Sequence, residues 1–87
     1  MDRDSINQTL RRMLVNDLFI EKPEEQIGVD DDLRTVIGLD SIGFSEIRIL
    51  SERKFDIEIA DDDFNRDNFS TIRRVTSLIM RIKGLSH

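Results

Sequence analysis

Apolar residues recur at helical spacing in three stretches of the chain, which predicts three principal helices. The first helix is expected to begin at Asp4 or Ser5 and to end near Ile20. Pro23 stops it, because a proline disfavours helical geometry at the residue before it. The apolar stripe of this helix consists of Ile6, Leu10, Met13, Leu14 and Leu18.

The second helix is expected from Ser41 to about Lys54, and the third from a cap at Ser70 or Thr71 to a stop at Gly84. Both boundaries follow from residue types that satisfy the unpaired backbone groups at helix ends. The apolar positions are Ile42, Ile47 and Leu50 in the second helix and Ile72, Val75, Leu78, Ile79 and Ile82 in the third.

The connections are expected to be ordered as well. Residues 21–40 form a long acidic loop, and loops of that length inside a compact domain are often functional. The alternating run 55–59 has no second strand to pair with, so it is interpreted as an extended connector that places its apolar residues in the core. Residues 61–64 are expected to open a short helical turn, anchored by Phe64 and Phe69. The prediction is a single all-α domain spanning residues 1–87.

Charge and composition narrow the function classes. The net charge is −5, and residues 21–40 carry seven acids against two bases, which opposes binding to nucleic-acid phosphates. No apolar run approaches the length of a membrane span, and the first residues lack the layout of a signal peptide. The absence of cysteine excludes disulfides and thiolate metal sites. The expectation is a soluble, unexported, cytoplasmic protein.

Catalytic chemistry has few candidates in this sequence. The single histidine is the last residue, His87, where catalytic positioning is not expected. The acid run at residues 30–32 lacks the alternating ligand spacing and distal Glu of a calcium loop, so a solvated loop with a capped turn is expected instead. The chain is therefore predicted not to be an enzyme.

Ser41 is the residue of greatest interest, because it stands where the acidic loop meets the second helix. A hydroxyl at a helix N-terminus lies where unpaired N–H groups and the macrodipole favour a phosphate. Alternatively, Asp40 or Ser41 simply caps the helix. Gly43 is either an incidental small residue or a place where another molecule approaches the serine. Two function classes remain, a covalent carrier and a non-covalent helical protein-interaction module without a prosthetic group.

The run Leu39-Asp40-Ser41-Ile42 adds a family resemblance. It matches the Asp-Ser-Leu signature of acyl carrier proteins of the phosphopantetheine-binding kind, with Ile in place of Leu. The run 55–59 looks like the segment after that family's second helix. The resemblance implies a four-helix bundle and a 4′-phosphopantetheine arm joined through a phosphodiester to Ser41. It also implies that Asp40 assists the phosphopantetheinyl transferase during loading, through the magnesium of that enzyme.

The resemblance further implies a monomer that carries an acyl or aminoacyl group as a thioester and does no chemistry itself. The implied partners are the transferase, an acyl- or aminoacyl-loading enzyme, and a downstream acyltransferase or synthase. Residues 64–72 look like the discrete carriers of D-alanine, of amino acids, or of glyceryl-derived and methoxymalonyl units. This favours a role in polyketide or nonribosomal peptide biosynthesis, including antibiotic biosynthesis.

The second helix carries mixed charges, whereas general carriers present an acidic helix. This favours a dedicated partner whose surface carries acids as well as bases. Alternatively, the charges form a solvated face with intrahelical pairs such as Glu52 with Arg48. Phe44 and Phe64 either flank the arm and shield a small acyl chain or belong to the core. The predicted partner-binding residues are Ile42, Phe44, Glu46, Arg48, Glu52 and Arg53.

Overall fold

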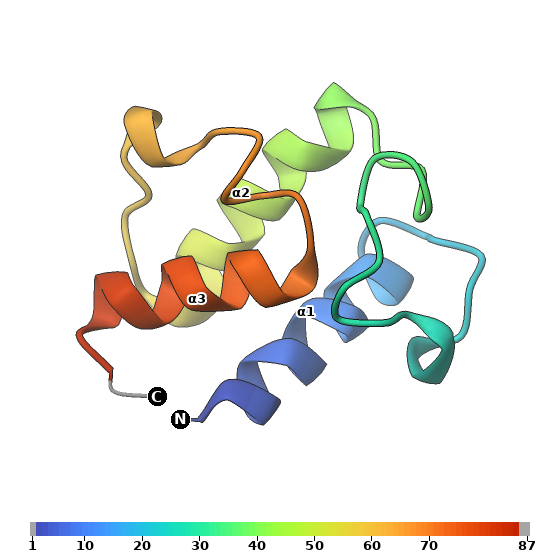
Figure 1. The fold of residues 1–87 in the computed structure, drawn as a ribbon, viewed down its shortest axis with the longest axis horizontal. Coiled ribbons are helices and arrows are strands. Elements are labelled where there is room, and N and C mark those ends of the chain that lie inside the picture. Colours follow the sequence, from blue (N-terminus) through green and yellow to red (C-terminus); the bar gives the residue numbers. More distant parts are fainter. Residues whose placement is uncertain (1, 86–87) are drawn as a thin grey trace.

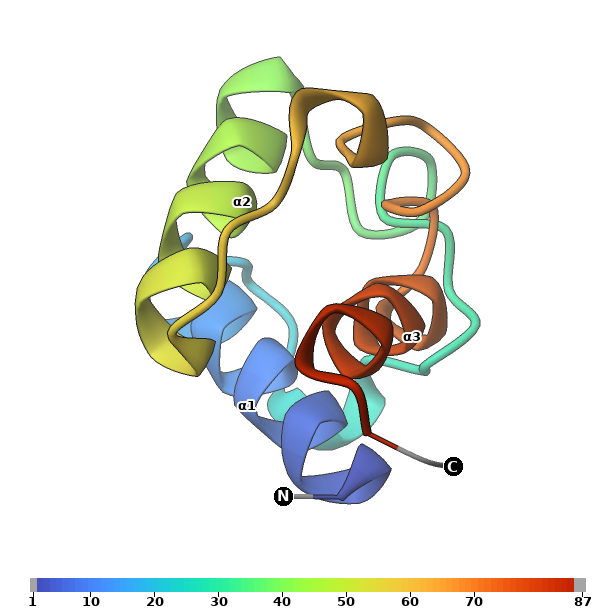
Figure 2. The ribbon, with the colours of Figure 1, turned by 90° about the vertical axis from the view of Figure 1, so that its left-hand side faces the viewer.

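The computed structural model describes residues 2–85 and is all-α, as predicted (Figure 1). The elements in chain order are α1 (Arg3–Asn16), the 3₁₀ turn η1 (Glu24–Gln26), α2 (Ser41–Phe55), the 3₁₀ turn η2 (Asp61–Asp63) and α3 (Ile72–Lys83). No strand occurs in the described residues. The short fourth helix expected between α2 and α3 is thus a single 3₁₀ turn. Helix α1 packs against both α3 and α2, and α2 and α3 lie across the core from each other (Figure 2).

The predicted end of the first helix near Ile20 is wrong, because α1 ends at Asn16. The Asp17 and Leu18 amides both donate to the Met13 carbonyl, which closes the last turn. Phe19 then adopts a left-handed backbone conformation with φ of 59°. Leu18 and Ile20 still pack against the core, so the apolar spacing continues beyond the helix itself.

The core gathers apolar side chains from all three helices and from the loops between them. Three loop residues, Ile27, Leu33 and Leu39, are as buried as the helical core, and burying such a side chain stabilises by about 1.5–3 kcal/mol. Ile59 is buried and Ile57 is half-buried, which confirms the connector interpretation for residues 57–59. Phe55 is also buried, but it is the last residue of α2 and does not belong to the extended segment. The loops are therefore packed elements of the fold.

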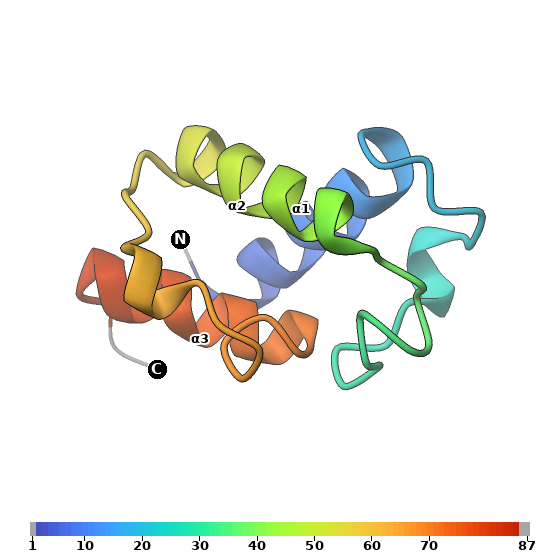
Figure 3. The same ribbon diagram turned by 90° about the horizontal axis from the view of Figure 1, so that it is seen from above.

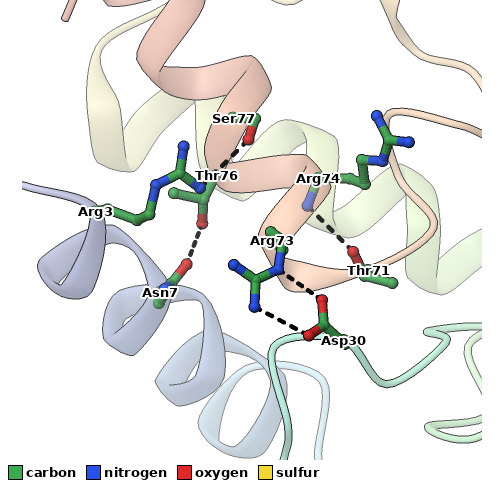
Figure 4. Close-up of polar contacts among 8 residues, drawn as sticks. All are labelled: Arg3, Asn7, Asp30, Thr71, Arg73, Arg74, Thr76 and Ser77. Carbon is green, nitrogen blue, oxygen red and sulfur yellow. Dashed lines mark hydrogen bonds and ion pairs between the residues drawn. The ribbon is translucent and has the colours of Figure 1, made fainter. Parts of the chain in front are cut away.

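The long connection between α1 and α2 lies at the end of the bundle where α1 ends and where α2 and α3 begin (Figures 1 and 3). It is fastened to the start of α3 by two backbone hydrogen bonds. The Leu33 amide donates to the Ser70 carbonyl at 2.9 Å, and the Arg73 amide donates to the Val29 carbonyl at 3.0 Å. The Arg73 guanidinium also donates twice to the Asp30 carboxylate, at 2.6 and 2.9 Å (Figure 4).

The other two acids of the loop hold its turns. Asp31 accepts a hydrogen bond from the Gly28 amide, and Asp32 accepts from the amides of Arg34 and Thr35. This confirms that the acid run caps a short turn. Within residues 2–85, no helix is both long and apolar enough to cross a membrane.

Two buried hydroxyl groups in the core differ in whether they have a hydrogen-bond partner. The Thr76 hydroxyl of α3 donates to the side-chain Oδ1 atom of Asn7 in α1, and both residues are buried (Figure 4). The Ser51 hydroxyl of α2 is fully buried and has no hydrogen-bond partner among the described residues. A buried hydroxyl left unpaired costs about 1–3 kcal/mol.

Replacing Ser51 by Ala is therefore expected to raise the free energy of unfolding by about 1 kcal/mol. The measurement is urea denaturation at neutral pH. Ser45→Ala, on an exposed position of the same helix, is the control for the higher helix propensity of Ala. A loss of stability in Ser51→Ala that Ser45→Ala does not show would contradict the absence of a partner for this hydroxyl.

The Asp30–Arg73 pair predicts a pH dependence. The hydrogen bonds from Arg73 hold the pKa of Asp30 below its usual value of 3.8. A carboxylate with a lowered pKa stabilises the fold above its unfolded pKa, and this contribution is lost as the pH falls through its folded pKa. The stability difference between wild type and Asp30→Asn is thus expected to persist at about pH 6 and to vanish towards about pH 2. Asp62→Asn, which removes an exposed acid without an ion pair in the described chain, serves as the control. A difference that stays constant over this range argues against the pair.

Candidate functional site

The start of α2 is fixed by Leu39 and Asp40. Leu39 is buried, and its amide donates to the Leu33 carbonyl at 2.9 Å. Asp40 has extended backbone geometry, and its carboxylate accepts from the Gly43 amide at 2.8 Å. Asp40, and not Ser41, is therefore the N-cap of this helix.

Ser41 is the first residue of α2 and is exposed. Its hydroxyl makes no hydrogen bond to the chain described, and the amides of Ser41 and Ile42 also have no partner there. A free primary hydroxyl thus lies beside unpaired N–H groups at the positive end of the helix dipole. This arrangement fits the attachment of a phosphate ester.

A pocket of about 490 Å³ opens beside Ser41, within the size range of small-molecule sites. Phe44, Phe64 and Phe69 give it apolar walls, and the rings of Phe64 and Phe69 meet edge to face with centroids 5.0 Å apart. Phe44 belongs to the buried core and Phe64 packs against it, so the core alternative holds for Phe44, while both rings also line the pocket. That the two rings flank a prosthetic arm stays a prediction. The remaining lining residues are Asp32, Arg34, Thr35, Ser45, Asn65, Arg66 and Ser70.

The pocket is assembled from three segments that are distant in sequence. The turn at residues 32–35 and the segment 64–70 lie side by side, joined by the hydrogen bond from the Leu33 amide to the Ser70 carbonyl (Figure 2). The first turn of α2 closes the third side. Ser41 therefore belongs to a shaped site and not to an isolated helix end.

Three predicted partner-binding residues project from the surface of α2. Ile42 is 73% exposed, and Glu46 and Arg53 are also exposed. Ile49, seven residues after Ile42 and therefore on the same face, is a further exposed apolar residue. Phe44 is buried and lines the pocket, so most of its surface is covered by the chain itself.

Arg48 and Glu52 contact the η2 region, and the expected intrahelical pair between them is not formed. The Arg48 guanidinium donates to the Ile59 carbonyl and to the Asp61 carboxylate, each at 2.7 Å, and lies over the Phe64 ring. The Glu52 carboxylate accepts from the Ile59 amide at 2.9 Å. The structure gives both residues a role in holding the segment after α2, and a role in partner binding stays a prediction.

Gly43 is crowded by the protein's own chain. A Cβ atom at this position would lie 3.0 Å from a Leu39 methyl carbon and 3.6 Å from a Leu18 methyl carbon. The small residue therefore lets α2 approach these two leucines. The close packing against these leucines is enough to explain a glycine at this position, without another molecule approaching Ser41.

Sequence reasoning missed the polar rim of the pocket. Arg34 and Arg66 both line it, and the Arg34 guanidinium carbon lies 5.0 Å from the centroid of the Phe44 ring. Both residues come from loops, where no periodicity indicates which way a side chain points. The predicted exclusion of His87 as a catalytic residue lies outside the described residues.

Comparison with known proteins identifies the family. Residues 8–79 match the family model described as the phosphopantetheine attachment site. This chain belongs to that family. The relatives include D-alanyl carrier proteins from Streptococcus gordonii, Streptococcus sanguinis and Streptococcus thermophilus. Each is 27% identical over 71 residues, which cover 82% of this chain and 87% of the relative.

A solved structure of an acyl carrier protein from Enterococcus faecalis has the same fold. It superposes with a TM-score of 0.75 at 21% identity, covering 94% of this chain and 99% of that one. The predicted resemblance to acyl carrier proteins and the predicted fold class are confirmed. The chain is a carrier and not a catalyst, and its prosthetic group is 4′-phosphopantetheine. Family membership implies a phosphopantetheinyl transferase and a loading enzyme as partners.

The N-cap geometry gives a test at Asp40. Asp40→Ala is expected to lower the free energy of unfolding by about 1 kcal/mol, because the Gly43 amide loses its acceptor. Asp40→Asn is expected to remain near wild type, since an asparagine caps as well as an aspartate. Urea denaturation of both variants provides the measurement. Equal stability of Asp40→Ala and wild type would show that this cap is not needed.

Proposed function

We propose that this protein is a discrete carrier that holds an acyl or aminoacyl group as a thioester on a 4′-phosphopantetheine arm attached to Ser41. The observation that supports the attachment point is the exposed, unpaired hydroxyl of Ser41 at the start of α2, beside a pocket. Because Asp40 caps the helix, this hydroxyl is not needed for the fold. The position also falls inside the region that matches the family model.

The roles of the protein's own residues follow from this geometry. Ser41 provides the oxygen of the phosphodiester, and the adjacent unpaired amides favour the negative charge that the ester brings. Asp40 orients the first turn, and its carboxylate lies next to the attachment point, where it can assist the magnesium of the transferase. The arm supplies the terminal thiol that a chain without cysteine lacks.

The pathway is part of the same proposal. The character of residues 64–72 favours polyketide or nonribosomal peptide assembly, including antibiotic biosynthesis. The similarity to D-alanyl carrier proteins favours a second candidate, an aminoacyl carrier whose cargo is an amino acid such as D-alanine. Both candidates share the attachment chemistry and differ only in the loading enzyme and the downstream acyltransferase or synthase.

The partner-facing surface is proposed to be the exposed side of α2. Ile42 provides an apolar contact, and Glu46 and Arg53 provide charges of opposite sign. A mixed surface suits a dedicated partner that carries both acids and bases, because like charges across an interface reject wrong partners. The carrier is proposed to act as a cytoplasmic monomer.

The attachment point is tested by incubating the protein with coenzyme A and a broad-specificity phosphopantetheinyl transferase, followed by intact-protein mass spectrometry. Wild type is expected to gain the mass of one arm, and Ser41→Ala is expected to gain none. Ser45→Ala is the matched control, because it removes the same atom from a neighbouring exposed serine of the same pocket. Loading of Ser41→Ala at the wild-type rate, or loss of loading in Ser45→Ala alone, would refute the assignment.

A further inference from the structure

Arg34 is held in a defined place by its surroundings. Its backbone belongs to the turn that Asp32 caps, and the neighbouring Leu33 amide is bonded to the Ser70 carbonyl. Its guanidinium carbon lies 5.0 Å from the centroid of the Phe44 ring, within the range of a cation–π contact. The loop thus places the positive charge of Arg34 against the first turn of α2.

This charge lies close to the attachment serine. Phe44 follows Ser41 by three residues, so the two side chains share one face of the helix, about 5–6 Å apart at their Cβ atoms. Ser41, Phe44 and Arg34 also line the same pocket. A group bonded to the Ser41 hydroxyl therefore enters the space in front of the Arg34 guanidinium.

Arg34 has no carboxylate within ion-pair distance in the described chain, and neither has Arg66 of the same pocket. By contrast, Arg12, Arg48, Arg73 and Arg81 each pair with an acid. The acid nearest to Arg34 in sequence is Asp32, and its Oδ1 atom accepts two backbone amides of its own turn. The lining of the pocket contains two arginines and one acid, so it is positive in a protein with a net charge of −5.

We propose that Arg34 is a positioning residue that binds the phosphodiester on Ser41 and thereby directs the prosthetic arm into the pocket formed with Phe44, Phe64 and Phe69. The inference rests on the proposed attachment at Ser41. A guanidinium offers paired N–H donors that match phosphate oxygens, and the unpaired amides of Ser41 and Ile42 complete the set of donors. The contact with the Phe44 ring reduces the side-chain freedom that the arginine loses when it binds.

The absence of cysteine makes the test direct, because the thiol of the arm is the only thiol in the loaded protein. The experiment measures the rate at which the neutral reagent iodoacetamide alkylates this thiol in fully loaded protein. Each rate is measured over a range of pH and corrected for the thiolate fraction, so that a change in thiol pKa is separated from a change in exposure. Complete loading is verified by intact mass before each measurement.

Arg34→Gln is expected to raise the corrected alkylation rate by about two- to fivefold, the range that an exposed ion pair supplies. Arg34→Lys, which keeps the charge without the fork, is expected to lie between this variant and wild type. Salt at about 1 M should bring wild type close to Arg34→Gln, because it screens exposed charges. Arg74→Gln is the matched control, since it removes an exposed and unpaired arginine that lies outside the pocket. Thermal unfolding of each variant verifies that the fold is retained.

A second readout reports on the arginine itself. In protein labelled with ¹⁵N, the Arg34 Nε–Hε resonance is expected to shift when the arm is attached, and the Arg74 resonance is not. Equal alkylation rates for Arg34→Gln and Arg74→Gln, with no shift of the Arg34 resonance, would overturn the inference. So would a shift of the Arg34 resonance that occurs only when the thiol carries a succinyl group, because the arginine would then bind an anionic cargo. A failure of Ser41 to be loaded at all refutes the proposed function instead.

Discussion

The hydrogen bond from the Gly43 amide to the Asp40 carboxylate is the interaction on which the site depends. The side chain of Asp40 accepts a hydrogen bond from an otherwise unpaired amide in the first turn of α2, so the Ser41 hydroxyl is not needed as the cap. The position of this cap is fixed in turn by Leu39, which is buried and bonded through its amide to Leu33. A buried leucine, a capping aspartate and a free serine thus follow one another, and each one fixes the place of the next.

The walls of the pocket depend on two sets of charged contacts that join one segment of the chain to another. On one side, Arg73 fastens the long loop to α3 through Asp30 and the Val29 carbonyl. On the other side, Arg48 and Glu52 fasten the segment after α2 through Ile59 and Asp61. The charged residues of α2 therefore divide into two that hold the site, Arg48 and Glu52, and three that are exposed, Glu46, Arg53 and Lys54.

Periodicity in the sequence was sufficient to predict three helices, and the Asp-Ser pair was sufficient to predict where α2 begins. It was not sufficient for the end of α1, because Leu18 and Ile20 are buried without being helical. It also did not show that Arg48 and Glu52 contact residues 59–61, since their spacing of four residues equally suits an intrahelical pair. The pocket could not be predicted from the sequence, because its rim consists of loop side chains. The directions of these side chains depend on long-range hydrogen bonds, such as the one between the Leu33 amide and the Ser70 carbonyl.

The charge of the pocket affects how well it can accept an aminoacyl group or a neutral acyl group. An aminoacyl group with a free ammonium would be repelled by the unpaired Arg34 and Arg66, whereas a neutral acyl group would not be. A phosphodiester bound at Arg34 changes this balance, because its single negative charge neutralises the excess positive charge of the lining. The loaded pocket then disfavours neither class. On this argument the charge of the pocket leaves the choice of cargo to the loading enzyme, which the proposed partner surface on α2 would have to recognise.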